Sequence, residues 1–212
     1  MIYKLNLTKT KDKFIEKIFQ SSMKDLNDFY GINWKINIPK IIIVKDRQTI
    51  DLMYVEKTEP WVVAWADNDS KIVYILDKNN FEQQSSHKYS DRYYASLIKH
   101  ELSHLFYKIV SKNRRGPVWL SEGVAIYTSG QTKLKSRPKE FKNFLEFYDK
   151  GGSEVYAESG FAVEALVGAF GKNKLLKLIK SLPEANTEKD FNVIFRKIYG
   201  FELNYKSINR IY

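Results

Sequence analysis

The residues best suited to chemistry in this chain are two histidines that enclose a glutamate: His100, Glu101 and His104. On a helix, side chains at positions i and i+4 project from the same face, about 6 Å apart. This spacing lets two imidazoles bind one zinc ion, with Glu101 beside them to take a proton from water. The pattern predicts a metal site. Five-residue matches of this kind also arise by chance on surface helices.

A third ligand is predicted at Glu122, in the run Trp-Leu-Ser-Glu-Gly at the start of a second predicted helix. The 17 residues between His104 and Glu122 leave room for a helix end, a loop and a return. The chain has no cysteine, so the ligands must come from His, Asp and Glu. Two histidines and one carboxylate leave a fourth position for water, as in catalytic zinc sites. Taken alone, Glu122 is also explained by the helix dipole, which favours acidic residues in a first turn.

His-Glu-x-x-His followed by Trp-Leu-Ser-Glu-Gly-Val-Ala-Ile-Tyr resembles the gluzincin metallopeptidases, in particular the peptidase MA-like group. The likeness covers roughly residues 60–210, and it is more specific in these motifs than in the helical segment that follows. The resemblance implies a zincin-like fold and one zinc ion held by His100, His104 and Glu122. It also implies that Glu101 acts as the general base of peptide hydrolysis.

By the same resemblance, a hairpin before the metal-binding helix supplies an edge strand along which the substrate backbone aligns. Either strand of the hairpin can be the outer one. We place the substrate-binding edge at five residues: Val62, Val63, Ala64, Trp65 and Ala66. Tyr156 is the candidate catalytic donor to the developing oxyanion, because a neutral tyrosine can donate a hydrogen bond. A packing role for Tyr156, as one of 14 tyrosines, is equally open.

The sequence departs from the family pattern at two points. Thermolysin-like members have an Asp four residues after the ligand Glu, where this chain has Ile126, so support for the histidines must come from elsewhere. The Gly-x-Met-Glu-Asn element that anchors the substrate amine in related aminopeptidases is missing. The predicted function is therefore a zinc-dependent endopeptidase that acts on peptide or protein substrates.

The elements that must position these residues fall into two halves. The first half shows the periodicity of a helix, a buried strand, a short helix and a hairpin, over residues 12–30, 40–45, 47–55 and 61–66 with 71–76. The second half shows only helical patterns, over residues 90–110, 117–129, 139–148, 154–170, 172–181 and 188–199. We predict an α+β fold with a small mixed β-sheet and helices, an active-site helix and then an all-helical C-terminal half. One catalytic domain is expected over 1–212, with an α/β subdomain (1–111) and a helical subdomain (112–212) that supplies the third ligand.

Composition narrows the possible partners. No stretch approaches the ~20 apolar residues of a membrane span. The net charge is +10, but the lysines are spread along the chain, so we expect a solvated surface and no nucleic-acid binding. Residues 1–13 lack the apolar block of a secretory signal, which predicts a cytoplasmic protein and leaves a mature secreted form open. The sequence carries no prediction of oligomeric state.

Two rival interpretations stay open. One is an inactive relative that binds metal or recognises protein without turnover, for example if the segment from Ser129 to Lys150, with its six basic residues, closes the cleft as a lid. The other is a nucleic-acid-binding protein with a structural metal, which would need a fourth protein ligand and a clustered basic face. The third histidine, His87, lies in a polar loop and is predicted to be exposed.

Overall fold

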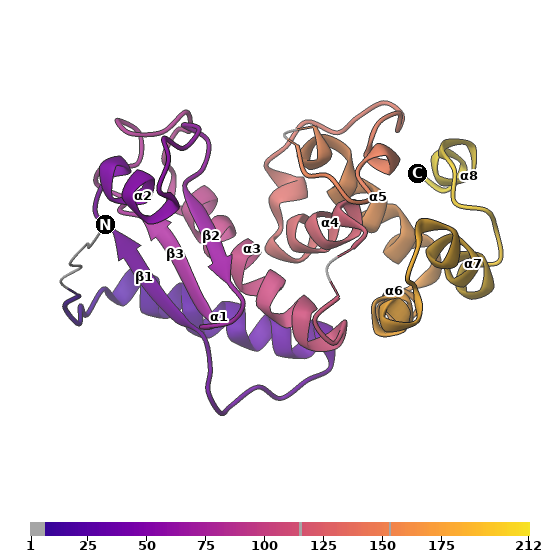
Figure 1. The fold of residues 1–212 in the computed structure, drawn as a ribbon, viewed down its shortest axis with the longest axis horizontal. Helices are drawn as coiled ribbons and strands as arrows, with labels where there is room; N and C mark the ends of the chain where they lie inside the picture. The colour runs from indigo at the N-terminus through magenta and orange to yellow at the C-terminus, as the bar shows by residue number, and fades with distance from the viewer. Residues whose placement is uncertain (1–6, 115, 153) are drawn as a thin grey trace.

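The computed structural model describes residues 7–114, 116–152 and 154–212 of the chain. Within these residues, eight α-helices accompany a three-stranded sheet, and every strand lies before residue 77. Figure 1 shows the sheet with its helices at one side of the molecule and the C-terminal helices at the other. The predicted α+β class, with a small mixed sheet followed by helices, is confirmed.

The sheet has the strand order β1-β3-β2. Its strands are β1 (Lys40–Val44), β2 (Ala64–Asp67) and β3 (Ile72–Leu76). β1 runs parallel to β3, with Lys40 opposite Ile72, and β2 runs antiparallel to it, with Ala64 opposite Ile75. Asp67 Oδ1 accepts hydrogen bonds from the backbone of the turn that follows β2. The expected hairpin is present, and β2 is its outer strand.

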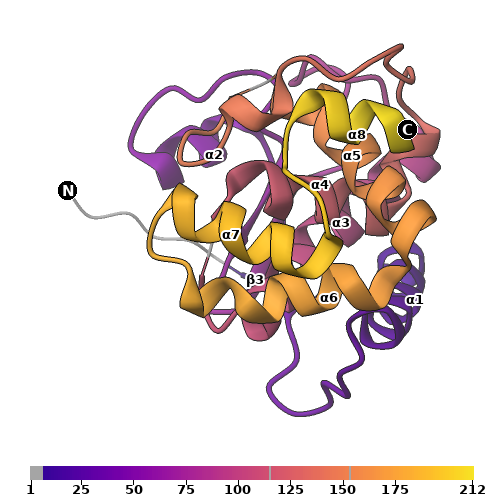
Figure 2. The ribbon, with the colours of Figure 1, turned by 90° about the vertical axis from the view of Figure 1, so that its right-hand side faces the viewer.

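The helices surround one long central helix, α3. They are α1 (Lys13–Tyr30), α2 (Arg47–Tyr54), α3 (Asp91–Val110), α4 (Val118–Ser129), α5 (Val155–Phe170), α6 (Lys172–Ser181), α7 (Glu188–Tyr199) and α8 (Tyr205–Ile211). α3 contacts α1, β2 and β3 as well as α4 and α6. Figure 2 shows α6, α7 and α8 on the side of the molecule that is turned away from the sheet. A single cluster of buried apolar side chains, from Ile15 to Ile208, includes residues of both halves.

Helices α4 and α5 approach each other closely because glycine stands at their contact. A Cβ at Gly123 would lie 2.6 Å from Ser159 O and 2.8 Å from a methyl carbon of Val163. On the facing helix, a Cβ at Gly160 would overlap the side chain of Ile126. Side chains larger than hydrogen do not fit at these positions without movement. The close contact holds α5 against the helix that carries Glu122.

One predicted helix is wrong. Residues 139–148 contain a single 3₁₀ turn, Phe144–Glu146, in place of the expected α-helix. The backbone N–H groups of Lys142, Asn143 and Phe144 donate to the Glu158 carboxylate on α5, at 2.8–3.1 Å. A side-chain acceptor from elsewhere in the fold therefore takes donors that a helix would have used.

Two predictions concern the surroundings of the protein. No helix in the described residues is both long and apolar enough to cross a membrane. The predicted cytoplasmic location rests on residues 1–13, of which residues 1–6 lie outside the described part. That location stays a prediction.

Candidate metal centre

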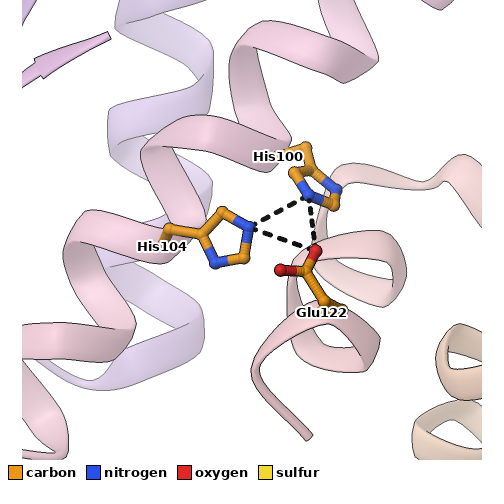
Figure 3. A group of neighbouring side chains, drawn as sticks. All are labelled: His100, His104 and Glu122. Atoms are coloured by element: carbon orange, nitrogen blue, oxygen red, sulfur yellow. Dashed lines mark hydrogen bonds and ion pairs between the residues drawn. The ribbon is translucent and has the colours of Figure 1, made fainter. Parts of the chain in front are cut away.

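Three ligand atoms from two helices converge at one point (Figure 3). His100 Nε2 lies 3.0 Å from His104 Nε2, both on α3. Glu122 Oε2, on α4, lies 3.3 Å from the first nitrogen and 3.4 Å from the second. Two ligands of a tetrahedral zinc ion, each ~2.1 Å from the metal, are about 3.4 Å apart. The three atoms therefore have nearly the spacing of three corners of a zinc tetrahedron.

The helices explain this convergence. His100 and His104 are one turn apart on α3 and face α4 across a tight helix pair. Glu122 lies in the second turn of α4 and is buried, as is His100. Among the described residues, these three form the one group of His, Cys, Asp and Glu side chains close enough to share a metal ion.

Two buried atoms of this cluster lack a hydrogen-bond partner in the described part of the chain: His100 Nδ1 and Glu122 Oε2. Buried polar atoms in folded proteins nearly always have a partner. Glu122 Oε2 faces two imidazole nitrogens, and a cation between the three atoms would satisfy the carboxylate oxygen. The donor set and this orphaned oxygen both fit a zinc ion.

The electrostatics of the cluster favour an ionised ligand at Glu122. Burial by itself would raise the pKa of this carboxyl, but His104 and His100 outweigh burial and hold the pKa below its ordinary value. Because metal ions bind carboxylates in the deprotonated form, Glu122 is already in the state a metal requires.

Glu101 has the opposite electrostatic setting. Burial raises the pKa of its carboxyl, and the nearby charge of Glu122 adds to this effect. His100, His104 and a backbone hydrogen bond from Ala66 act against the rise without cancelling it. A carboxyl whose pKa moves towards neutrality is better suited to accept and return a proton.

Ser121 orients one of the histidines. Its Oγ lies 3.3 Å from His104 Nδ1. A proton on Nδ1 directed at this hydroxyl leaves the lone pair of Nε2 free for a metal. Ile126 stands where thermolysin-like proteins have an Asp. In this chain the Ser121 hydroxyl, and not a carboxylate, supports His104. The sequence analysis missed this residue, although it directly precedes Glu122 in the motif.

Strand β2 borders the site with its outer edge. Leu76 N donates to Val63 O at 2.8 Å, and the alternation of an antiparallel ladder then turns the backbone groups of Ala64 and Ala66 away from β3. In the described residues no further strand pairs with this edge. The backbone hydrogen bond from Ala66 to Glu101 joins the edge strand to the carboxyl beside the metal cluster.

Two of the five predicted edge residues lie outside the strand. Ala64, Trp65 and Ala66 belong to β2, whereas Val62 and Val63 precede it. Val62 N donates to Glu59 O at 2.9 Å, and Val62 O accepts from the Arg47 guanidinium at 2.6 Å. The Val62 backbone is therefore committed to a turn. The prediction that the strand starts at residue 61 is wrong.

A pocket of about 250 Å³ adjoins His100 and Glu101. Tyr156, at the start of α5, lies on its wall with its ring 6.5 Å from the His100 ring and 6.4 Å from the Trp61 ring. The structure thus places Tyr156 beside the cluster, as its predicted role requires. The pocket is lined by Trp61, Val62, Val63, Ala64, His87, Tyr93, Leu97, His100, Glu101, Gln131, Lys135 and Tyr156.

His87 is half-buried in this pocket and is not the exposed residue that its polar loop suggested. Its Nε2 lies 3.1 Å from Trp61 O, and its Nδ1 lies 3.1 Å from the Tyr93 hydroxyl. A carbonyl oxygen only accepts hydrogen bonds, so His87 Nε2 donates to Trp61 O, and Nδ1 shares a second hydrogen bond with the Tyr93 hydroxyl. His87 thereby ties the Trp61 loop to α3, a contact that local sequence does not reveal.

Comparison with protein-family models, with curated proteins and with solved structures gives no match for this chain. The resemblance to gluzincins rests on the motif residues alone and stays a prediction. The features that point to a function are the geometry of the cluster, the carboxyl beside it and the adjoining pocket.

Proposed function

We propose that this protein is a zinc-dependent peptidase of the gluzincin type, with a zincin-like fold, that hydrolyses internal peptide bonds. The observation that carries the proposal is the convergence of His100, His104 and Glu122 on a point beside the buried carboxyl of Glu101. The unpaired edge of β2 and the pocket next to Glu101 offer room for a peptide.

Zinc in such a site supplies Lewis acidity, which polarises a peptide carbonyl and makes water a nucleophile near neutral pH. Glu101 takes the proton that the attacking water loses. As the C–N bond breaks, Glu101 passes this proton to the leaving amine nitrogen. The water oxygen remains on the new carboxyl group, so one water molecule is consumed for each bond cleaved.

Two further groups act on the substrate. The outward backbone groups of Ala64 and Ala66 align an extended peptide by main-chain hydrogen bonds, as in strand addition. The Tyr156 hydroxyl donates a hydrogen bond to the carbonyl oxygen. This hydrogen bond strengthens in the transition state, because negative charge develops on that oxygen. Loss of one such donor costs about 10²- to 10³-fold in kcat, so Tyr156→Phe should show that loss while its zinc content stays unchanged.

The test is incubation of the zinc-loaded chain with a diverse peptide mixture and identification of the products by mass spectrometry, with Glu101→Gln in parallel. Internal cleavage by the wild type is expected, and Glu101→Gln should retain zinc and lose about 10²- to 10⁴-fold in rate. Equal cleavage by both would remove Glu101 from the mechanism. Trimming from one end would refute the endopeptidase assignment. No cleavage by either protein would favour a metal-binding module without turnover.

A further inference from the structure

The pocket beside Glu101 is lined by two kinds of side chain. Trp61, Tyr93, Tyr156 and Leu97 are aromatic or aliphatic. Gln131 and Lys135, from the segment just after α4, are polar. An apolar substrate side chain would match only the first kind.

Gln131 is the first of two polar groups that the segment after α4 contributes to the pocket. It lies in a 3₁₀ turn, Gln131–Lys133, and is only 5% exposed. Within the described residues its side-chain amide makes no hydrogen bond, although it lines an open pocket. The amide can therefore exchange hydrogen bonds with a group that enters the pocket.

Lys135 is the second such group. It has no ion pair with any described residue, and Glu101 is the only acidic side chain that lines the pocket with it. The Lys135 side chain is exposed and lines the pocket, so its ammonium can reach an anion that binds there. The ammonium would form a charge-assisted hydrogen bond with such an anion.

We propose that this pocket selects a substrate residue that carries a carboxylate, with Lys135 and Gln131 as the residues that determine the preference. The carboxylate pairs with the Lys135 ammonium and accepts from the Gln131 amide, while the aliphatic stem of the residue packs against Trp61 and Leu97. Because Glu101 lines the same pocket, the selected residue stands next to the bond that is cleaved. This inference rests on the proposed function for its catalytic meaning, but the binding preference can be measured without turnover.

The carboxylate can come from an internal glutamate or from the end of a peptide chain. Three matched peptides separate these sources: one with an internal Glu and an amidated end, its Gln counterpart, and the Gln counterpart with a free C-terminal carboxylate. Binding is measured by calorimetry on the zinc-loaded Glu101→Gln variant, and kcat/KM is measured on the zinc-loaded wild type. A charge-assisted contact predicts about tenfold preference for one carboxylate-bearing peptide over the amidated Gln peptide.

Variants at Lys135 test the assignment. Lys135→Met should remove the preference, and Lys135→Glu should reverse it in favour of a peptide with Lys in place of Glu. Lys133→Met is the matched control, because Lys133 is exposed and lines a different pocket, beside α1 and α3. Lys133→Met should keep the wild-type preference. If it also loses the preference, the cause is the general loss of positive charge and not a contact with Lys135.

Equal binding of all three peptides, no peptide binding, or a preference that survives Lys135→Met would overturn the inference. The outcome is separable from the test of the peptidase itself. Cleavage without a carboxylate preference removes the inference and leaves the peptidase standing. A carboxylate preference in binding, with no cleavage by the wild type, keeps the pocket assignment and removes the peptidase.

Discussion

Two glutamates, Glu122 on α4 and Glu158 on α5, are buried to a similar degree and have opposite surroundings. Three backbone N–H groups and the side-chain amide of Asn143 donate to the Glu158 carboxylate. Glu122 Oε2 accepts no hydrogen bond from the described residues and faces His100 and His104 instead.

The difference separates a carboxylate with a structural role from one that we propose binds a metal ion. The hydrogen-bond donors to Glu158 come from the loop that this carboxylate fixes against α5. Glu158 therefore needs no ligand from outside the fold. In the proposed site, a cation between the two imidazoles would bind the Glu122 carboxylate. Burial alone does not distinguish the two residues. They differ in their neighbours, which are backbone N–H donors at Glu158 and imidazole rings at Glu122.

The largest expected effect follows from replacing one carboxylate oxygen by an NH₂ group in each residue. Glu158→Gln places an NH₂ group against backbone N–H donors and should lower the zinc-free free energy of unfolding by about 3 kcal/mol. The matched variant Glu122→Gln removes a carboxylate that has no backbone donor and is favoured only by the two imidazoles, so at pH 8 it should lower zinc-free stability by about 1 kcal/mol. Urea unfolding of both variants measures the contrast, and equal losses would contradict it.

A smaller effect is expected where α4 and α5 meet. Gly123→Ala drives a methyl group into Ser159 O and should cost about 2 kcal/mol by overpacking. Gly168→Ala in α5 is its control, since a Cβ there meets no atom within 4 Å and should stabilise the helix by up to about 1 kcal/mol. Thermal unfolding distinguishes the two, and a neutral Gly123→Ala would mean that the helices can separate freely.

The next effect concerns the support of His104. Ser121→Ala should weaken zinc binding by about tenfold, the lower end of the range for lost outer partners of metal ligands. Folding without zinc should change little, because the Ser121–His104 contact of 3.3 Å is long. Competition with a zinc chelator measures the affinity. Unchanged affinity would show that the hydroxyl does not orient the ring.

The smallest effect involves Glu101, a third buried glutamate. Burial raises the pKa of Glu101, so its neutral form favours the zinc-free fold at low pH, and this contribution is lost as pH rises through the raised pKa. Glu101→Gln does not ionise and should gain stability relative to wild type as pH increases from 4 to 8. Unfolding curves across this range check the sign. A constant difference would mean that the Glu101 pKa is ordinary.

Local patterns in the sequence predicted the elements that hold the site. The i, i+4 spacing placed His100 and His104 on one helix, and the length of chain before Glu122 allowed its return. Helices such as α6 and α7 have the predicted bounds because periodicity and end signals are local. The approach of Glu122 to the two histidines was predicted from the motif and from the length of the intervening chain, and not from periodicity.

The remaining features depend on contacts between distant parts of the chain. The expected helix over 139–148 is absent because its donors go to Glu158, and α8 was missed because it is a short helix capped by Asn204. Val62 left the strand because Arg47 holds its carbonyl. The pocket roles of Gln131 and Lys135 follow from the path of the chain after α4, which no motif encodes.

We propose that His100, His104 and Glu122 together hold one metal ion. Zinc titration calorimetry of the metal-free chain tests it most directly, with Glu122→Gln, His104→Ala and Glu158→Gln alongside. We predict one zinc ion per chain, affinity lower by about 100-fold or more in the first two variants, and wild-type affinity in folded Glu158→Gln. No zinc binding by the wild type, or undiminished binding by Glu122→Gln and His104→Ala, would contradict the account.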